Sequence, residues 1–438
     1  MTSTLPLAYS AREQRAWYLY DWANSAFATT VLGVFVGPYL TAVANTAADA
    51  RGFVHPWGIP IAAGAFSSYV TGLSVGLQVL ILPVIGAIAD YGRRKKECLA
   101  VTAYLGAAVT IAMFFLEGKN YLLGGLLLVV SNVSFGASIV IYNSFLPEIA
   151  PPEQRDAVSS RGWALGYVGG GILLALNLLL ATFAEKAGIS QAMVARISLC
   201  SAGVWWALFT IPVLAGLRNR GAARILPPGQ HAVGAAVREL IHTLKDMRRY
   251  PQTLKFLIAY LLYNDAIQTF LAQAGVFGNR ELGMPLSSLA LAFLISQIVG
   301  IFGASGFGRL ARIITAKRAV VASVVVWTAV LLYVYLAVRT PLEYFILAGV
   351  VGVVMGGSQA LSRSIFAQLI PQGKEAEYFG VYEISDKGTS WLGPIFFGLT
   401  YQFTMSYRSA ILSLLVFFVA GLAVLVRVDV EQGERDLA

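Results

Sequence analysis

The sequence predicts an all-α membrane protein with twelve transmembrane helices arranged in two bundles of six. Three observations predict this fold class. The chain of 438 residues is 57% hydrophobic and only 13% charged, whereas soluble domains are about 25% charged. Apolar stretches of about 20 residues, the length that crosses a bilayer as a helix, recur along the whole chain. A polar pattern in the first stretch returns in the seventh, which indicates a duplicated bundle.

Twelve stretches are long and apolar enough to be spans. In the first half we expect them at Trp17–Thr41, Ala63–Ala89, Cys98–Leu116, Tyr121–Leu146, Arg161–Phe183 and Ile197–Leu217. In the second half we expect them at Thr253–Phe277, Ser288–Leu310, Ala319–Val338, Leu342–Ile365, Gly388–Met405 and Ser409–Val426.

The placement of Lys and Arg predicts the orientation. Cytoplasmic loops carry an excess of these residues, and here they gather on the side that holds both termini and the central loop. We therefore expect both termini in the cytoplasm. Of the 32 basic residues, the other side receives only Arg51, Lys119, Lys186, Arg196, Arg280, Arg339 and Arg408.

The longest linker divides the chain into three parts. We expect an N-terminal six-helix bundle at 1–217, a cytoplasmic linker at 218–252 and a C-terminal six-helix bundle at 253–438. Within the linker an amphipathic helix is predicted to lie among the lipid headgroups, or to serve as a plain tether between the bundles. The net charge of +9 is carried by loops between apolar segments, so anionic lipid headgroups are the expected partner and nucleic acid is not. The apolar face of this helix is formed by Val233, Val237, Leu240, Leu244 and Met247.

Two polar octets carry the candidate substrate or coupling site. Each sequence, Tyr20 to Phe27 and Tyr263 to Phe270, has an acid followed three places on by a carboxamide and four places on by a hydroxyl. An acid inside a membrane helix usually faces the bundle interior and marks a solute or proton path. It could also be a structural group, held by a buried Arg or by backbone amides near the membrane surface. The candidate residues are Asp21, Asn24 and Ser25 in the first octet and Asn264, Asp265 and Gln268 in the second.

Position within the span separates the two acids. Asp21 lies about one turn into its expected span, which leaves the functional and structural interpretations open. Asp265 lies near the middle of its expected span, which favours a functional role. Other pairs of similar segments, which occur in the same order in both halves, support the duplication. One pair is Tyr167-Val168-Gly169-Gly170 and Trp391-Leu392-Gly393-Pro394. Parallel repeats of this kind place the solute site between the two bundles.

The loop after the second span resembles the loop motif of the major facilitator superfamily. It reads from Gly86 through Asp90, Gly92, Arg93 and Arg94 to Lys96. The resemblance implies that these residues form a charge network at the cytoplasmic gate, which breaks as the protein changes state. One residue, Tyr91, separates the acid from the second glycine, where the family pattern has two. The alternative is a short basic loop that only anchors the orientation.

The first octet resembles a narrower branch of that superfamily, the vacuole effluxer-like transporters. Two further stretches resemble the branch, Tyr142 to Ile149 and Arg161 to Gly170, and the similarity covers the whole chain. The resemblance implies efflux or exchange of small solutes by alternating access, with amino acids as the first expected cargo. The short loops and tails favour the cell membrane of a prokaryote, with the vacuolar membrane as the alternative in a eukaryote.

Further candidate site residues lie at paired positions in the two halves. Arg363 and Asn143 form one such pair. Arg363 could bind a substrate carboxylate, neutralise Asp21 or Asp265, or reach the cytoplasmic surface. Trp163 and Tyr167, paired with Trp391, could line a cavity, or serve as ordinary packing or an interfacial belt.

The remaining features limit the class of function. Cys98 and Cys200 offer neither a disulfide framework nor a metal-binding spacing. A phosphate-binding GxxxxGK[ST] motif is absent from the sequence, so an ATP-driven pump is not supported. We expect a monomeric secondary transporter, not an enzyme, without cofactor or metal, acting on a small molecule with a proton as a further candidate partner. The alternatives are a permease or drug exporter for another organic solute, a receptor that kept the fold, and a membrane enzyme.

Overall fold

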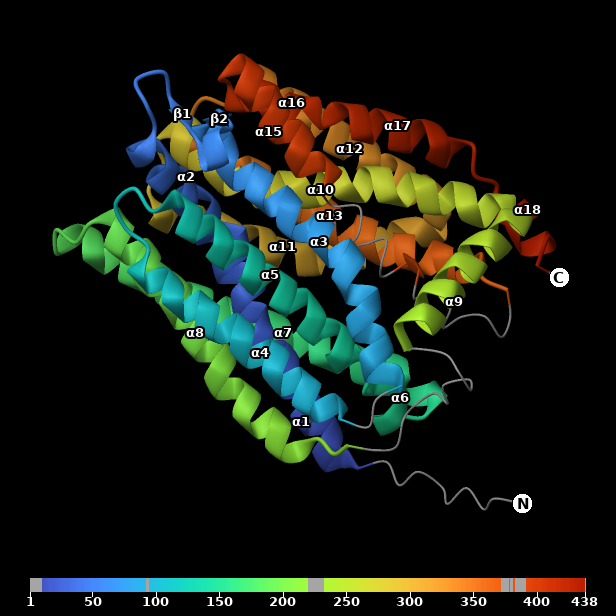
Figure 1. Cartoon of the computed structure of the whole chain (residues 1–438). Coiled ribbons are helices and arrows are strands. Elements are labelled where there is room, and N and C mark those ends of the chain that lie inside the picture. Colours follow the sequence, from blue (N-terminus) through green and yellow to red (C-terminus); the bar gives the residue numbers. More distant parts are fainter. Residues whose placement is uncertain are drawn as a thin grey trace.

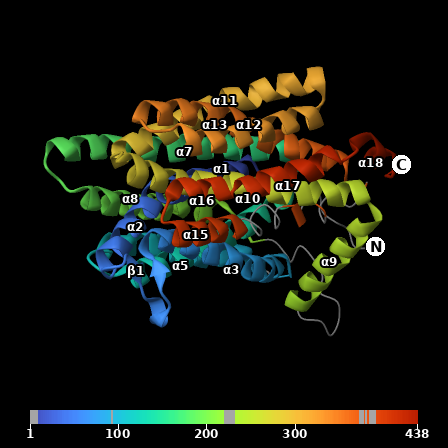
Figure 2. The same cartoon turned by 90° about the horizontal axis from the view of Figure 1, so that it is seen from above.

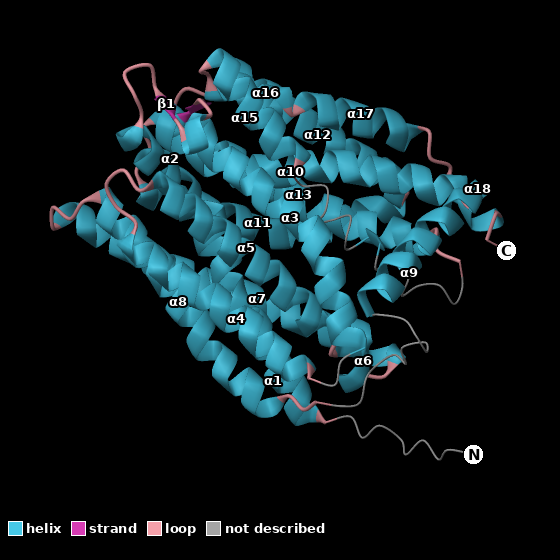
Figure 3. Ribbon diagram, in the orientation of Figure 1, coloured by secondary structure: helices cyan, strands magenta, loops and turns pink. Residues whose placement is uncertain are grey.

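The described chain is almost entirely helical in the computed structural model (Figure 3). The structure describes residues 10–91, 94–219, 232–371, 378, 381–382 and 391–437. A single pair of two-residue strands is the only sheet among these residues. Membrane spans must satisfy their backbone hydrogen bonds internally, and helices do so along their whole length.

The first half of the chain contains the elements α1 to α8 (Figure 1). In chain order they are α1 Ala11–Ala26, the π-helix η1 Phe27–Phe35, α2 Val36–Ala47, β1 Phe53–Val54, the 3₁₀ turn η2 Pro56–Gly58, β2 Ile61–Ala62, α3 Ala63–Tyr91, α4 Lys95–Ala112, η3 Met113–Phe115, α5 Tyr121–Asn143, α6 Leu146–Ile149, α7 Pro152–Lys186 and α8 Gln191–Gly216.

The linker and the second half contain the elements α9 to α18. They are α9 Ala232–Asp246, η4 Met247–Arg249, α10 Pro251–Leu282, α11 Leu286–Ile314, α12 Ala316–Leu336, α13 Pro341–Gln368, α15 Leu392–Thr404, α16 Tyr407–Ser413, α17 Leu415–Val426 and α18 Val430–Arg435.

Ten stretches of the described chain are long and apolar enough to cross a membrane. Large apolar side chains lie exposed along their outer faces, for example Leu80, Val101 and Phe302, as expected of helices that contact lipid. Helix α10 is not among the ten, since it carries polar residues along its length, and α15 has only 13 described residues. The expected all-α membrane fold is confirmed.

The first membrane helix is longer than its apolar run. It extends without a break from Ala11 through η1 to Ala47, six residues before the expected start at Trp17. Asp21 is therefore well inside the helix, and the expectation that it lies one turn from the start is wrong. Hydropathy detects only the apolar part of a helix, because the end that projects from the bilayer is polar.

The helices form two groups that approach each other at one end of the molecule. Helices α1 to α8 make up one group and α10 to α17 the other, with α7 beside α11 and α3 beside α15 (Figures 1 and 2). The strands β1 and β2 mark one end, which we call the hairpin end. The start of α1 and the helices α9 and α18 mark the opposite end, which we call the tail end (Figure 1).

The hairpin between α2 and α3 is organised around one carboxylate. Asp49 Oδ1 accepts the backbone N–H groups of Arg51 and Phe53, each at 2.9 Å, and Asp49 Oδ2 lies 3.0 Å from His55 Nε2. The hydrogen bond with His55 is the main cause that lowers the pKa of Asp49 to about 2. At the tip, Trp57 is 90% exposed and has a positive φ of 49°.

Helix α9 joins the two groups at the tail end. It packs along α3 of the first group, and the buried residue Asp246 at its end accepts the hydroxyl of Tyr378 at 2.9 Å. Just beyond, Thr253 Oγ1 donates to the carbonyl oxygen of Leu369. The end of the linker is therefore fastened to the second group of helices.

Candidate functional site

Asp21 lies at a contact between three helices of the first group. Its Oδ2 atom accepts the hydroxyl of Tyr142 on α5 at 2.7 Å. Gly162 and Gly166 of α7 face it so closely that a methyl group on either would crowd the Asp21 side chain or, at Gly166, the hydroxyl of Ser25. Tyr142 is itself held, because its ring stacks on Trp17 and its carbonyl oxygen accepts Trp17 Nε1.

Asp265 is more deeply enclosed. Its residue is 1% exposed, and its Oδ2 atom accepts the backbone N–H of Gly393 in the first turn of α15 at 2.9 Å. Among the described residues its Oδ1 atom has no hydrogen-bond partner, and neither has the hydroxyl of Thr269, also 1% exposed. Both oxygens lie against Gly393, where a Cβ would be 3.0 Å from Asp265 Oδ1 and would overlap Thr269 Oγ1.

The two acids have equivalent surroundings in the two groups of helices. In each case the acid and the hydroxyl four residues later, Ser25 or Thr269, lie on one face of a long helix. In each case that face packs against a glycine of a second helix, α7 in the first group and α15 in the second. These two helices carry corresponding stretches of the sequence repeat. The acids differ in their donors: a tyrosine hydroxyl for Asp21, and a backbone N–H for Asp265.

The amides of the octets lie beside the acids, inside the helix groups. Asn24 is buried and its Nδ2 atom has no hydrogen-bond partner. Asn264 is buried, and its Oδ1 atom accepts a hydrogen bond from Nε2 of the half-buried Gln268 at 3.5 Å. These three side chains therefore lie on the same helices as the acids.

The other predicted site residues are placed less centrally. Asn143, at the end of α5, and Arg363, late in α13, are both exposed. Trp163 is 58% exposed and Tyr167 45%, and their ring centroids are 6.1 Å apart. Trp391 is half-buried immediately before α15. The predicted role of these residues in the site stays a prediction.

The predicted gate residues are only partly described. Gly86 lies on α3 with Val140 of α5 at 3.4 Å from the position of a Cβ, and Arg94 is exposed just before α4. Asp90 lies within α3 and its side chain is outside the described part of the structure, as are Gly92 and Arg93. The adjacent Lys95 forms a buried ion pair with Glu148 at 2.6 Å and also donates to the carbonyl oxygen of Ser144.

A set of glycines brings the two helix groups together at the hairpin end. We call this contact the glycine seam. In α3, Gly72 lies against the carbonyl of Trp391 and the side chain of Ile395, and Gly64 lies against the ring of Tyr401. Hydrogen bonds across the same end include Tyr407 to Gly64 and Leu286 to Gln191. The seam consists of Gly33, Gly37, Gly64, Gly72, Gly275 and Gly398.

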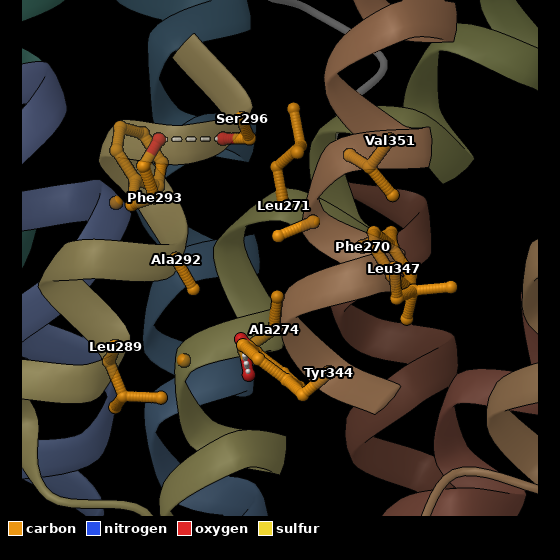
Figure 4. A pocket seen from close by; sticks show the side chains of 13 residues that line it. Phe270, Leu271, Ala274, Leu289, Ala292, Phe293, Ser296, Tyr344, Leu347 and Val351 are labelled. Carbon is orange, nitrogen blue, oxygen red and sulfur yellow. Dashed lines mark hydrogen bonds between the residues drawn. The ribbon is translucent and has the colours of Figure 1, made fainter. Parts of the chain in front are cut away.

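A cavity of about 50 Å³ lies beside the seam (Figure 4). It lies between η1, α10, α11 and α13, and its lining includes Phe270, Phe293 and Tyr344, with no predicted site residue (Figure 4). Ligand pockets for small organic molecules are about 300–1,000 Å³. This cavity is therefore too small to be the transport site as it stands.

Sequence reasoning did not single out four residues that the structure places beside the acids or near the predicted gate. Tyr142 and Lys95 contact their partners across helices far apart in the sequence, so no local pattern reveals those contacts. The sequence did contain a pattern that marks Thr269 and Gly393. The hydroxyl follows the acid by four residues in both octets, and Gly393 occurs in a repeated motif.

Solved structures with this arrangement of helices are membrane transporters. The chain superposes on the peptide transporter POT with a TM-score of 0.68 at 12% identity, over 97% of this chain and 96% of that one. It superposes on the xylose transporter XylE of E. coli with a TM-score of 0.64 at 11% identity, over 97% and 99% of the two chains. At these identities the likeness establishes the fold alone.

Relatives in sequence define the class. An uncharacterized MFS-type transporter of Bacillus subtilis, YxiO, is 32% identical over 97% of this chain and 98% of its own length. Autophagy-related protein 22-1 of Aspergillus niger is 28% identical over 98% of this chain and 90% of its own length. The chain is therefore a multi-pass membrane transporter of the major facilitator type.

The family is narrower than the class. Residues 9–438 match the family model described as vacuole effluxer Atg22 like. The chain belongs to that family, and the resemblance noted in the octet is confirmed. A bacterial relative and a vacuolar family description fit residence in a cell or vacuolar membrane.

Proposed function

We propose that this transporter moves small zwitterionic solutes, amino acids first, out of the compartment that faces its tail end. The observation that supports this most is the pair of intramembrane acids, one in each helix group, each packed with a neighbouring hydroxyl against a glycine of its own group. A carboxylate suits a substrate ammonium, and the exposed Arg363 suits a substrate carboxylate. The family description as an effluxer favours the direction.

The proposed binding residues are those of the octets and their neighbours. The first octet would contribute Asp21, Asn24 and Ser25, and the second Asn264, Asp265 and Gln268. Arg363 and Asn143, with Trp163, Tyr167 and Trp391, would close around cargo in another conformation. Coupling to a proton through one of the acids is part of the proposal.

We further propose that the hairpin end faces away from the cytoplasm. The residues Arg51, Lys119 and Arg339 are the kind of sparse basic residues expected there. Helices α10 and α15 would complete twelve spans, with bundles at 1–217 and 253–438 and the linker at 218–252. Basic residues of the linker helix would lie against anionic headgroups.

Flux in proteoliposomes tests the proposed substrate. Purified protein is reconstituted and loaded with radiolabelled amino acids, and efflux is compared with that of a nucleoside, a sugar and a dipeptide. We expect amino-acid efflux at least tenfold above protein-free vesicles. Arg363→Gln should reduce it at least tenfold, because a guanidinium contact with a carboxylate is lost.

Arg427→Gln is the matched control, since Arg427 is a second exposed arginine near the tail end. It should leave the flux unchanged. Efflux confined to the nucleoside, the sugar or the dipeptide would replace amino acids with another organic solute. An equal loss in both arginine variants would contradict a binding role for Arg363.

A further inference from the structure

We propose that Asp265 is the residue that takes up and releases the proton, and that its proton holds the glycine seam closed. This inference rests on the proposed transport function and assigns the two acids different roles. Asp265 would be the exchangeable group that controls the hairpin end, whereas Asp21 would be a fixed hydrogen-bond acceptor.

The first argument is the number of unsatisfied atoms. Asp265 Oδ1 and Thr269 Oγ1 are both buried, both lack partners, and both border the same glycine. A buried polar group without a partner is unfavourable, because it has lost its hydrogen bonds to water without replacement. One proton on Oδ1 would turn the carboxyl into a donor toward Thr269 Oγ1, and would satisfy both atoms after a small rotation of the threonine side chain.

The second argument is the cost of the charged form. A buried ionised carboxylate needs a cation or several donors. Asp265 has one donor, Gly393 N–H, and no described Lys, Arg or His pairs with it. Ionisation in the closed state is therefore unfavourable, and exposure to water on opening would relieve it.

The titratable groups on the surrounding helices do not alter this argument. None of them is hydrogen-bonded to Asp265 or ion-paired with it among the described residues. On α10 they are Lys255, Tyr260, Tyr263, Arg280 and Glu281. On the described segments packed against α10 they are Tyr39, Arg248, Arg249, Arg309, Arg312, Glu343, Tyr344, Arg363, Tyr382, Tyr401, Tyr407, Arg408, Glu431, Glu434 and Arg435.

The third argument is the position of Gly393, whose backbone N–H donates to Asp265. Gly393 belongs to the first turn of α15, and Trp391 just before it contributes the carbonyl that touches Gly72 of α3. The helix bonded to the acid is thus the helix that closes the seam. A change of charge at Asp265 acts on α15 directly, with no intervening element.

Asp21 lacks these properties. It is only half-buried, and a tyrosine hydroxyl donates to it at 2.7 Å. Asp21 Oδ2 therefore already accepts a side-chain hydrogen bond, whereas Asp265 Oδ1 accepts none among the described residues. The two oxygens without a described partner are Asp265 Oδ1 and Thr269 Oγ1. Two oxygens suit a proton better than a metal cation, since hard cations take six or more oxygen ligands.

Distance measurements between spin labels test the proposal without any substrate. Lys119→Cys and Leu342→Cys place labels at exposed positions of the two groups at the hairpin end, the first in the loop before α5 and the second in the first turn of α13. The labelled chain has Cys98 and Cys200 replaced by Ala. We expect the short distance to dominate at pH 6. The ratio of long to short distances should rise as the pH increases to 9, by at most tenfold per pH unit for one proton.

Variants identify the residue. Asp265→Asn keeps an acceptor for Gly393 and mimics the neutral acid, so it should stay closed at every pH. Asp21→Asn should keep the pH response. Thr269→Val removes the acceptor for the proton and should shift the midpoint to lower pH, whereas Thr269→Ser should not.

Three results would overturn the proposal. They are a pH response that survives Asp265→Asn, a response abolished only by Asp21→Asn, and distances that follow Na⁺ but not pH. Flux measurements separate this from the transport proposal. Amino-acid efflux with an insensitive seam would refute the role of Asp265 alone, whereas absent efflux of amino acids would refute the proposed cargo whatever the distances show.

Discussion

At the scale of single residues, the ion pair between Lys95 and Glu148 is a structural group near the predicted gate. Lys95 is 4% exposed, and its ammonium reaches both the carboxylate and the carbonyl oxygen of Ser144. The pair connects the start of α4 to α6 at the tail end. It therefore fixes the part of the first group in which the charge network is predicted.

Lys95→Met should destabilise the protein by about 3 kcal/mol, because it removes the buried ammonium that pairs with Glu148 and donates to the Ser144 carbonyl oxygen. Unfolding in mixed micelles with a denaturing detergent would measure this. Lys96→Met is the control, since Lys96 donates its backbone N–H to Asn219 Oδ1, and the substitution keeps that group. Equal stability of the two variants would show that the pair contributes nothing.

Gly393 is a second residue whose size decides the packing. Gly393→Ala should lower stability by about 1–3 kcal/mol, because the methyl group would overlap Thr269 Oγ1. Thr269→Ala in the same chain should restore most of the loss, whereas Gly171→Ala should be silent, with open space around it. Thermal unfolding in detergent would report both effects, and additive losses in the double variant would exclude the contact.

At the scale of elements, the hairpin shows how an exposed loop is held. Its short strands pair Phe53 with Ala62 and Val54 with Ile61, and two strands of this length are not stable alone. The carboxylate of Asp49 supplies the missing constraint by accepting two backbone N–H groups and facing His55.

The hairpin should stay ordered in mild acid. The pKa of Asp49 is lowered, so its stabilisation is present above the unfolded value near 3.8 and is lost only as the pH falls through about 2. Hydrogen exchange at Arg51 and Phe53, corrected for intrinsic rates, should not change between pH 7 and pH 5. Asp49→Asn should accelerate it at both values, and Asp49→Glu, which keeps the charge, should do so less.

The elements also show what sequence could and could not predict. Hydropathy predicts the helices of the first half well, but starts them late where polar turns extend beyond the apolar run, as at Ala11 and Pro152. The π-helix η1 has no local signal, because its wide turns depend on packing against α7, α8 and α10. The bond from Gly393 to Asp265 joins segments more than a hundred residues apart, beyond the reach of any periodicity.

At the scale of the whole molecule, the two helix groups meet through small residues at the hairpin end. Contacts of this kind let backbones approach closely and are common between membrane helices. They involve few long-range side-chain bonds, so they can form and separate repeatedly. This is what alternating access requires of a closed end.

Gly72→Leu should prevent the seam from closing while the protein still folds. The added side chain would meet the Trp391 carbonyl and Ile395, which lie 3.2 and 3.0 Å from the position of a Cβ. We expect flux to fall at least tenfold, with the two labels at the hairpin end held at the long distance. Gly349→Leu, in open space on α13, should retain flux. Normal transport by the Gly72 variant would show that the seam need not close.

The π-helix η1 has a consequence for protein engineering. A π turn holds more residues than an α turn, so the side chains of α1 and α2 are out of phase with a single continuous α-helix. Removing one residue between Phe27 and Phe35 would tighten the coil and swing one flank around the axis. The acid of the first octet would then point away from α7 while Gly37 kept its neighbours, which offers a way to uncouple the two ends of this span without changing any side chain.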